Sequence, residues 1–420
     1  MPFHVSLKAP AHVQQIMSEY QILAVIAAFV FLYCLAASRL ERTWFSGALV
    51  YVACGLILGP FGFHFVDLDV DGEALKQIAE LTLAVVLFID SAGANLPVLQ
   101  QIKRLPARLL LIGLPLTIAL GFVFGLLVYG DLTWVQLALL ATMLAPTDAA
   151  LGKAVISNEA VPSSVREGLN VESGLNDGIC VPVLLLFLAL AGGSMEGSIT
   201  EKMAHLMLEE IGIGALVGIP FAVIGSSALK TSIRNGWISG SWMQIPVISL
   251  ALLCFATAQW LGGSGFIASF AGGMTFGAMI KERKEELLEA AEGTGDVLAM
   301  ITWFVFGAMF IGDSLRNPEW QAVVYAVLSL TIIRMLPVFL SVLGAKIHWD
   351  TKLFLGWFGP RGLASIVFVV MVKQANIPGT ETLIQAVTWT VLLSVIAHGI
   401  TANPFAKAYA GRVHARGGAV

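Results

Sequence analysis

Charged residues are scarce in this sequence. Only 12% of the 420 residues are Asp, Glu, Lys or Arg, whereas soluble domains carry about a quarter. Hydrophobic residues make up 57% of the chain, and the mean hydropathy is +0.83. This composition excludes an ordinary soluble domain and predicts an all-α polytopic membrane protein. The net charge of −4 says little by itself, and it implies no nucleic-acid partner.

Cysteine is also rare. Cys34, Cys54, Cys180 and Cys254 all fall within apolar runs, at spacings that suit neither a zinc site nor a disulfide framework. They are expected to pack as small hydrophobic side chains. The first twenty residues lack a charged region followed by a cleavage site, so we expect no removed signal peptide.

Enzyme signatures are missing as well. No Ser-His-Asp arrangement and no HExxH motif is recognisable. Asp90, Asp148 and Asp177 lack the YD and GxGD contexts that mark intramembrane aspartyl proteases. We therefore expect no enzymatic activity and no cofactor.

Long apolar runs are what the sequence has in abundance. Runs of about 18 residues or more, broken by charged, Pro or Gly clusters, predict thirteen membrane spans. Their limits are 20–38, 44–63, 76–95, 106–129, 133–154, 163–192, 204–229, 242–261, 264–280, 295–312, 320–345, 351–372 and 382–405.

The basic residues predict the orientation of these spans. With the N-terminus outside, seventeen of the 24 lysines and arginines fall on the inside or at adjoining span ends. The outside holds Lys8, Lys76, Lys202, Arg316 and Lys373. Because basic residues concentrate on the cytoplasmic side of membrane proteins, the chain is predicted to run from outside to inside.

An odd number of spans favours an inverted repeat within one transporter unit, residues 1–420. Six spans in residues 20–192 would form the first repeat, and six spans in 242–405 the second. The span 204–229 would link them, and residues 406–420 would form a short cytoplasmic tail. Inverted repeats of this kind are a recurrent plan of secondary transporters.

Corresponding spans of the two halves contain helix breakers beside a charge. The fifth span contains Pro146 and Asp148, and the twelfth contains Pro360 and Arg361. Because proline removes a backbone donor and clashes with the preceding turn, both helices are expected to open there. Open backbone at membrane depth is tolerated where it lines a cavity. Kinks used for packing alone are the alternative.

Six ionisable residues lie well inside the predicted spans: Asp90, Asp148, Glu172, Asp177, Arg334 and Arg361. Each costs about 2.5–3.5 kcal/mol at the centre of a bilayer. Four acids and two bases leave at least one carboxylate that must bind a proton or a cation to be neutral. A carboxylate that alternates between these two occupants is the minimal machinery of a cation/proton exchanger.

Helical spacing separates the two acids of the sixth span. Ser173 and Asp177 are four residues apart and share a face, so their oxygens could coordinate one small cation. Glu172 and Asn176 lie on the adjacent face, which favours a structural ion pair for Glu172. The residues Glu80, Glu209, Glu210 and His398 look interfacial or isolated, and we expect them to serve packing.

Three motifs together resemble a known family. "PTDA" at 146–149, "ESGLND" at 172–177 and "GPRG" at 359–362 occur in the order found in the NhaP/NHE branch of the monovalent cation/proton antiporters. The resemblance covers roughly residues 20–405. It implies a homodimer in which a six-helix core domain moves between inward-open and outward-open states. It also implies that the two opened helices cross near the membrane centre.

The resemblance also implies roles for single residues. Asp177 matches the aspartate that binds cation and proton, and Asn176 matches its partner. Ser173 and Thr147 match further ligands, and Asp90 falls where an acid of the third span contributes. Glu172 would pair with Arg334. We add the hypothesis that Asp148 pairs with Arg361, each offsetting the dipole of a half-helix.

The activity expected from these residues is electroneutral. Asn176 cannot ionise, so the site has one exchangeable charge and would exchange one sodium or lithium ion for one proton, in a role in pH homeostasis. Potassium/proton exchange stays open because oxygen ligands alone do not fix cavity size; a cation channel is a more distant alternative. A prokaryotic inner membrane is the expected location. The charged loop 281–293 is expected to be a solvated helix end, and a regulatory element is the alternative.

Overall fold

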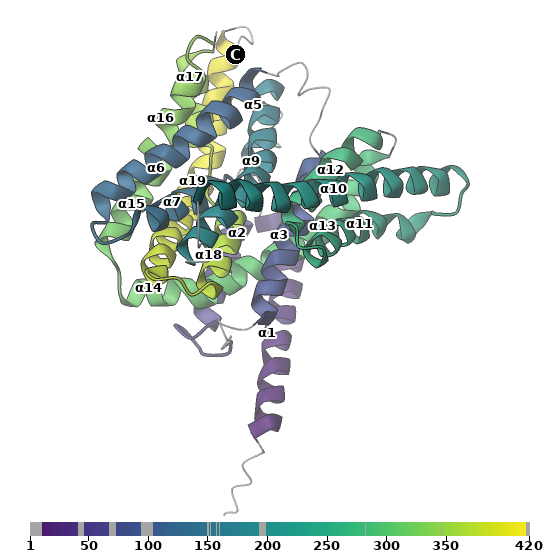
Figure 1. Cartoon of the computed structure of the whole chain (residues 1–420), viewed down its shortest axis with the longest axis horizontal. Coiled ribbons are helices and arrows are strands. Elements are labelled where there is room, and N and C mark those ends of the chain that lie inside the picture. Colours follow the sequence, from purple (N-terminus) through teal and green to yellow (C-terminus); the bar gives the residue numbers. More distant parts are fainter. Residues whose placement is uncertain are drawn as a thin grey trace, which may run out of the picture.

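Within the part of the chain that the structure describes, every regular element is a helix (Figure 1). The structure is a computed structural model. It describes residues 11–40, 46–66, 73–93, 104–148, 151, 153–156, 158, 160–192, 199–281, 283–345 and 347–416. The all-α class is confirmed. The loop expected at 281–293 is mostly helical, because α13 begins at Lys284.

The helices follow one another in this order. The first half contains α1 (Ala11–Leu40), α2 (Gly47–Leu58), α3 (Glu73–Gly93), α5 (Arg104–Arg108), the π-helical η1 (Leu109–Gly113), α6 (Leu114–Val128), α7 (Trp134–Met143), α8 (Lys153–Ile156) and α9 (Ser163–Ala191). The second half contains α10 (Ile199–Arg234), the 3₁₀ turn η2 (Gly240–Gln244), α11 (Pro246–Trp260), α12 (Gly265–Met279), α13 (Lys284–Phe306), the π-helical η3 (Gly307–Ile311), α14 (Gly312–Arg316), α15 (Trp320–Leu330), α16 (Ile332–Ser341), α17 (Trp349–Trp357), α18 (Leu363–Gln374) and α19 (Thr380–Ala415).

Seven helices in the described residues are long and apolar enough to cross a membrane, by length and composition. Five apolar helices are shorter, among them the half-helices α7 and α18 beside the expected openings. α3 has the length, but it carries Glu73, Lys76, Glu80 and Asp90. The chain is thus an integral membrane protein, while the count of thirteen spans and the inverted repeat stay predictions.

The helices pack in two groups with α9 between them (Figure 1). In one group α12 packs against α3, α10 and α11, around a core that includes Phe88 and Phe276. In the other, α6 packs on α7, and α19 packs on α15 and α18. α9 contacts members of both groups, so it joins them.

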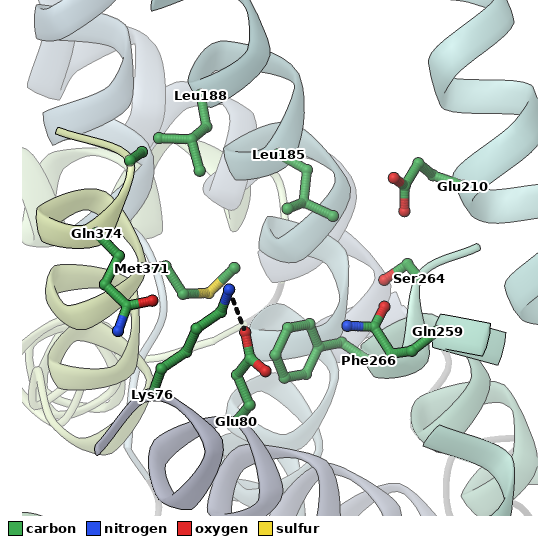
Figure 2. Close-up of a pocket in the computed structure, with 11 residues that line it drawn as sticks. Lys76, Glu80, Leu185, Leu188, Glu210, Gln259, Ser264, Phe266, Met371 and Gln374 are labelled. Carbon is green, nitrogen blue, oxygen red and sulfur yellow. Dashed lines mark ion pairs between the residues drawn. The ribbon is translucent and has the colours of Figure 1, made fainter. Parts of the chain in front are cut away.

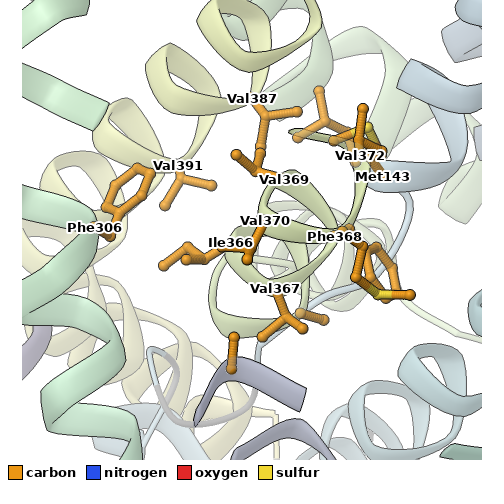
Figure 3. Close-up of a cluster of buried hydrophobic side chains, with 14 of the residues drawn as sticks. Met143, Phe306, Ile366, Val367, Phe368, Val369, Val370, Val372, Val387 and Val391 are labelled. Atoms are coloured by element: carbon orange, nitrogen blue, oxygen red, sulfur yellow. The ribbon is translucent and has the colours of Figure 1, made fainter. Parts of the chain in front are cut away.

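α18 occupies the centre of the second group. All residues from Leu363 to Val372 are buried, and Figure 3 shows its valines packed among Met143, Phe306, Val387 and Val391. A helix that is apolar on every side lies in a protein core or in a membrane, and α18 is surrounded by protein. The position of α18 fixes the opened segment that precedes it.

The chain opens at both expected prolines. Residues 144–148 after α7 and 358–362 before α18 are not helical. The two openings touch, because the backbone N–H of Asp148 donates to the carbonyl of Pro360 at 2.8 Å. The predicted openings in the fifth and twelfth spans are therefore confirmed.

Gly273 provides a test of the close packing between α12 and α3. A Cβ added at Gly273 would overlap the Phe88 carbonyl oxygen and the Ser91 hydroxyl. Overpacking of this kind costs about 1–3 kcal/mol. We expect Gly273→Ala to lower the melting temperature in detergent. The matched control is Gly212→Ala in α10, where an added Cβ has nothing within 4 Å; equal melting of the two variants would contradict the tight crossing.

Candidate functional site

The opening after α7 is held against α9 by three hydrogen bonds. The Ser173 hydroxyl donates to the Thr147 carbonyl at 2.6 Å. The Asn176 amide donates to the Thr147 hydroxyl at 2.8 Å, and its oxygen accepts from the Thr147 backbone N–H at 3.2 Å. All three residues are buried. Oxygens of Thr147, Ser173 and Asn176 therefore meet at one place, beside the break.

Asp177 follows Asn176 on α9, and its carboxylate is only 7% exposed. Its Oδ1 atom is buried and has no hydrogen-bond partner among the described residues. Burying a carboxylate oxygen without a donor is costly, so the group needs a proton or a cation to be stable there. Asp177 thus has the environment of an ion-binding carboxylate.

Glu172 lies five residues earlier on α9 and has a different environment. Arg334 of α16 donates two hydrogen bonds to it, at 2.5 Å and 2.9 Å, and both side chains are buried. The ion pair expected between these residues is present. Gly359 makes room for it, because a Cβ there would overlap the Arg334 guanidinium. Glu172 is therefore already neutralised by a fixed partner.

Asp148 and Arg361 do not form the expected ion pair. The Arg361 guanidinium donates to the carbonyls of Ala145 and, at 3.1 Å, Pro146. The Asp148 carboxylate accepts from the backbone N–H of Leu363 at 2.8 Å. The pairing was wrong because the unpaired groups at the two helix ends are nearer partners.

Each of these two side chains caps the helix end that the other opening exposes. Arg361 lies at the C-terminal end of α7, where a positive charge is favourable. Asp148 lies at the N-terminal end of α18, where a negative charge is favourable. Gly362 allows this approach, because a Cβ there would overlap the Asp148 carboxylate. The dipole part of the hypothesis agrees with this geometry.

Asp90 of α3 lies opposite α9. A Cβ added at Gly174 would come within 3.3 Å of the Asp90 Cβ, so Asp90 faces the turn that precedes Asp177. Its side chain is exposed, unlike Asp177. Asp90, Asp148 and Asp177 are close enough to interact electrostatically. Once Glu172 and Arg334 are paired, these three neighbouring acids face one further buried arginine among the described residues, Arg361.

The sequence reasoning missed two residues behind the second opening. The backbone N–H of Arg361 donates to the Ser394 hydroxyl at 2.7 Å, and Ser394 lies beside His398 on α19. His398 was expected to be isolated, yet it is buried among polar partners. The i, i+4 spacing of Ser394 and His398 could have drawn attention to a shared face.

A pocket of about 370 Å³ lies on the side where α9 ends (Figure 2). Its lining includes Leu185 and Leu188 of α9 and an ion pair of 3.7 Å between Lys76 and Glu80 of α3. Eight residues of helix separate Leu185 from Asp177, a rise of about 12 Å. This pocket therefore ends short of the buried carboxylate.

Comparisons with known proteins agree with this fold and with the motifs. The family described as sodium/hydrogen exchanger, transmembrane, matches residues 25–408. The K(+)/H(+) antiporter NhaP2 of Shewanella oneidensis is 24% identical over 368 residues, covering 86% of this chain and 62% of the relative. A probable Na(+)/H(+) antiporter of Schizosaccharomyces pombe is 25% identical over 429 residues, covering 90% of this chain and 54% of the relative. The chain thus spans less than two thirds of the length of either relative.

A solved structure shares the fold. The sodium proton antiporter MjNhaP1 from Methanocaldococcus jannaschii superimposes with a TM-score of 0.76 at 20% identity, covering 92% of this chain and 99% of that chain. Identity this low shows a common fold alone. The match over residues 25–408, however, spans nearly the whole sequence. This chain therefore belongs to the transmembrane sodium/hydrogen exchanger family.

Proposed function

We propose that this protein is a secondary antiporter that exchanges one monovalent cation for one proton. The observation that carries the proposal is the buried Asp177 carboxylate, whose Oδ1 has no hydrogen-bond partner among the described residues. A proton or a cation can supply the missing interaction, but the two cannot occupy the carboxylate together. Competition between them couples the two fluxes.

The neighbouring oxygens suit a weakly held ion. Thr147 and Ser173 offer neutral oxygens beside Asp177, and Asn176 orients Thr147. Among the described residues no three His, Cys, Asp or Glu side chains group as they do around a tightly bound metal ion. One carboxylate with neutral ligands balances one monovalent charge, which supports electroneutral exchange. Asp90, which is exposed and faces α9, would deliver the cation to this site.

The openings give the site a way to alternate between the two sides. Asp148 and Arg361 hold the exposed helix ends to each other, so α7 and α18 would move as one body with α9. Asp90, near the C-terminal end of α3, is exposed, whereas the pocket beside Lys76 and Glu80 near the N-terminal end stops short of Asp177. Both observations support access to the site from the C-terminal end of α3 in this state. With the N-terminus outside, that end of α3 faces the cytoplasm.

Sodium or lithium is the proposed ion, and potassium is the second candidate. The solved structure with the same fold is that of a sodium proton antiporter, and the Schizosaccharomyces pombe relative is a probable Na(+)/H(+) antiporter. The Shewanella relative is a K(+)/H(+) antiporter. Thr147 and Ser173 offer oxygen ligands beside Asp177, and oxygen ligands accept either ion.

We also propose a homodimer in a prokaryotic inner membrane. α1 projects from the other helices (Figure 1) and exposes large apolar side chains, including Phe31 and Leu35. An exposed apolar face on a helix of this kind fits lipid or a second copy of the chain. The inverted repeats 20–192 and 242–405, linked through 204–229, belong to the same proposal.

Proteoliposomes test the function directly. Vesicles that contain the protein and a pH-sensitive dye are challenged separately with sodium, lithium and potassium chloride. We expect proton flux with at least one of these salts, dependent on the opposing proton gradient and without a membrane potential. Flux that needs no proton gradient would favour a channel, and a potential generated by transport would contradict one-for-one exchange.

A further inference from the structure

His398 lies next to the second opening, which residues 358–362 form. It lies on α19 and is only 1% exposed. Its ring centroid is 5.2 Å from that of the Trp357 ring, and the two rings are tilted relative to each other. Its Nε2 atom lies 2.9 Å from the carbonyl oxygen of Trp357, the last residue of α17. The imidazole therefore bridges α19 and the end of α17, just before the Gly359-Pro360 break.

The other ring nitrogen faces two oxygens of one residue. Nδ1 lies 2.9 Å from the Ser394 carbonyl oxygen and 3.2 Å from the Ser394 hydroxyl. A neutral ring that donates from Nε2 accepts at Nδ1 from the hydroxyl. A protonated ring donates from both nitrogens, to the carbonyls of Trp357 and Ser394. The ring thus has hydrogen-bond partners in both protonation states. When it is protonated, the Ser394 hydroxyl loses Nδ1 as its acceptor.

Ser394 connects the ring to the ion site. Its hydroxyl accepts from the backbone N–H of Arg361, and the Arg361 guanidinium holds the carbonyls of Ala145 and Pro146. The next residue, Thr147, is bound to Ser173 and Asn176 beside Asp177. Hydrogen bonds, the Arg361 side chain and one peptide bond therefore connect His398 to the Thr147 network.

In the part of the chain that the structure describes, the charged groups near His398 are both positive. Arg361 comes from the opened segment and Arg334 from α16, the latter paired with Glu172 of α9. The aromatic rings of Trp357 and Phe358 beside the imidazole carry no charge. A proton on His398 therefore adds a third positive charge to the region that holds the opening together. It also removes the acceptor of the Ser394 hydroxyl.

We propose that His398 is a second proton-binding group, distinct from Asp177, that positions the opened segment and lowers exchange when it is protonated. The inference rests on the proposed antiport function. Histidine is the side chain whose charge ordinarily changes between pH 5 and 8. Burial and the positive charges of Arg361 and Arg334 disfavour a further positive charge, so His398 takes up its proton only in acid. The neutral ring stabilises the Ser394–Arg361 contact, and protonation weakens it. The acid side of the activity profile then reflects two groups rather than one.

The cation concentration distinguishes protonation of Asp177 from protonation of His398. Protons on Asp177 compete with the cation, so a high salt concentration restores exchange, whereas a proton on His398 is not displaced by the cation. Exchange is measured in proteoliposomes from pH 5 to 9 at increasing sodium or potassium chloride, whichever supports flux. We expect the wild type at saturating salt to keep losing activity in acid. His398→Gln retains a donor toward Trp357 and cannot titrate, so its profile should stay flat.

The expected difference is large. One pH unit below the wild-type midpoint, His398→Gln should exchange about tenfold faster than wild type at saturating salt, as for loss of one titrating group. The matched control is His414→Gln, an exposed histidine on the same helix, which should follow the wild-type profile. If His398→Gln and wild type have the same profile at saturating salt, the proposal is wrong.

A second variant and a second readout keep the test decisive. Ser394→Ala keeps the imidazole ring but removes its link to Arg361, so the loss of activity in acid should also disappear in this variant. An unchanged loss of activity in acid would contradict the connection through Ser394. Deuterium exchange of the peptide 357–363, corrected for the intrinsic effect of pH, needs no transport. Its protection should fall in acid in the wild type but not in His398→Gln. If the wild type transports nothing, the antiport function is contradicted. The protection of the peptide 357–363 then still tests whether His398 holds the opened segment.

Discussion

Asp177→Asn is expected to abolish cation/proton exchange while leaving the protein folded. Asparagine has nearly the same shape as aspartate, but it carries no charge and takes up no proton in the physiological range. The buried position of Asp177 would then hold a neutral amide, which removes the cost of an uncompensated carboxylate. Folding should therefore be retained or improved, while both transported species lose their binding group. Proton flux should fall to that of empty vesicles.

The control is the same substitution, aspartate to asparagine, at a position outside the proposed ion site. Asp313→Asn fits, because the Asp313 side chain is 81% exposed and its contact with Arg316 is long, at 3.9 Å. Asp313→Asn should exchange at the wild-type rate. Both variants are compared with wild type by size-exclusion chromatography and melting temperature. Normal exchange by a well-folded Asp177→Asn variant would refute the assignment of the site.

The second large effect concerns the buried ion pair between Glu172 and Arg334. Arg334→Met leaves the Glu172 carboxylate buried without its two hydrogen bonds. Loss of one partner of a buried pair costs about 3–5 kcal/mol, because the remaining charge is uncompensated. We expect the variant to express poorly and to melt at a much lower temperature in detergent.

The double variant Glu172→Gln with Arg334→Met separates the charge effect from packing. It removes both charges and leaves similar volumes, so it should recover much of the lost stability. Asp177 and its neighbours are unchanged in both variants. If the double variant melts as low as Arg334→Met, the cost comes from lost packing rather than from the isolated carboxylate.

Part of the candidate site could be predicted from local sequence. Pro146 and Pro360 open their helices because a proline cannot donate a backbone hydrogen bond wherever it is placed. Glu172 and Asp177 received different assignments because helical spacing puts them on different faces. The pairing of Glu172 with Arg334 came from the resemblance to the antiporter family, and the geometry agrees with it. These statements depend on residue type and on near neighbours in the chain.

The partners of Asp148 and Arg361 could not be predicted in this way. Counting charges matches acids with bases, but it takes no account of the backbone groups at helix ends. Arg361 and Ala145 are 216 positions apart, and Asp148 and Leu363 are 215 apart. Which of several acceptors a buried guanidinium reaches depends on how the two openings cross. His398 was misjudged for the same reason, since its partner Trp357 lies 41 positions away.

The sequence by itself determined that this is an all-helical membrane protein, where its helices open, and which side chains carry charge into the bilayer. Apolar composition, proline chemistry and helical periodicity act locally, so they hold whatever the rest of the chain does. Only the tertiary structure decided which groups neutralise those charges. The crossing of the openings places Arg361 on the carbonyls that follow α7 and Asp148 on the first N–H of α18. His398 lies against the carbonyl at the end of α17. Asp177 is left with a carboxylate oxygen that no described residue satisfies.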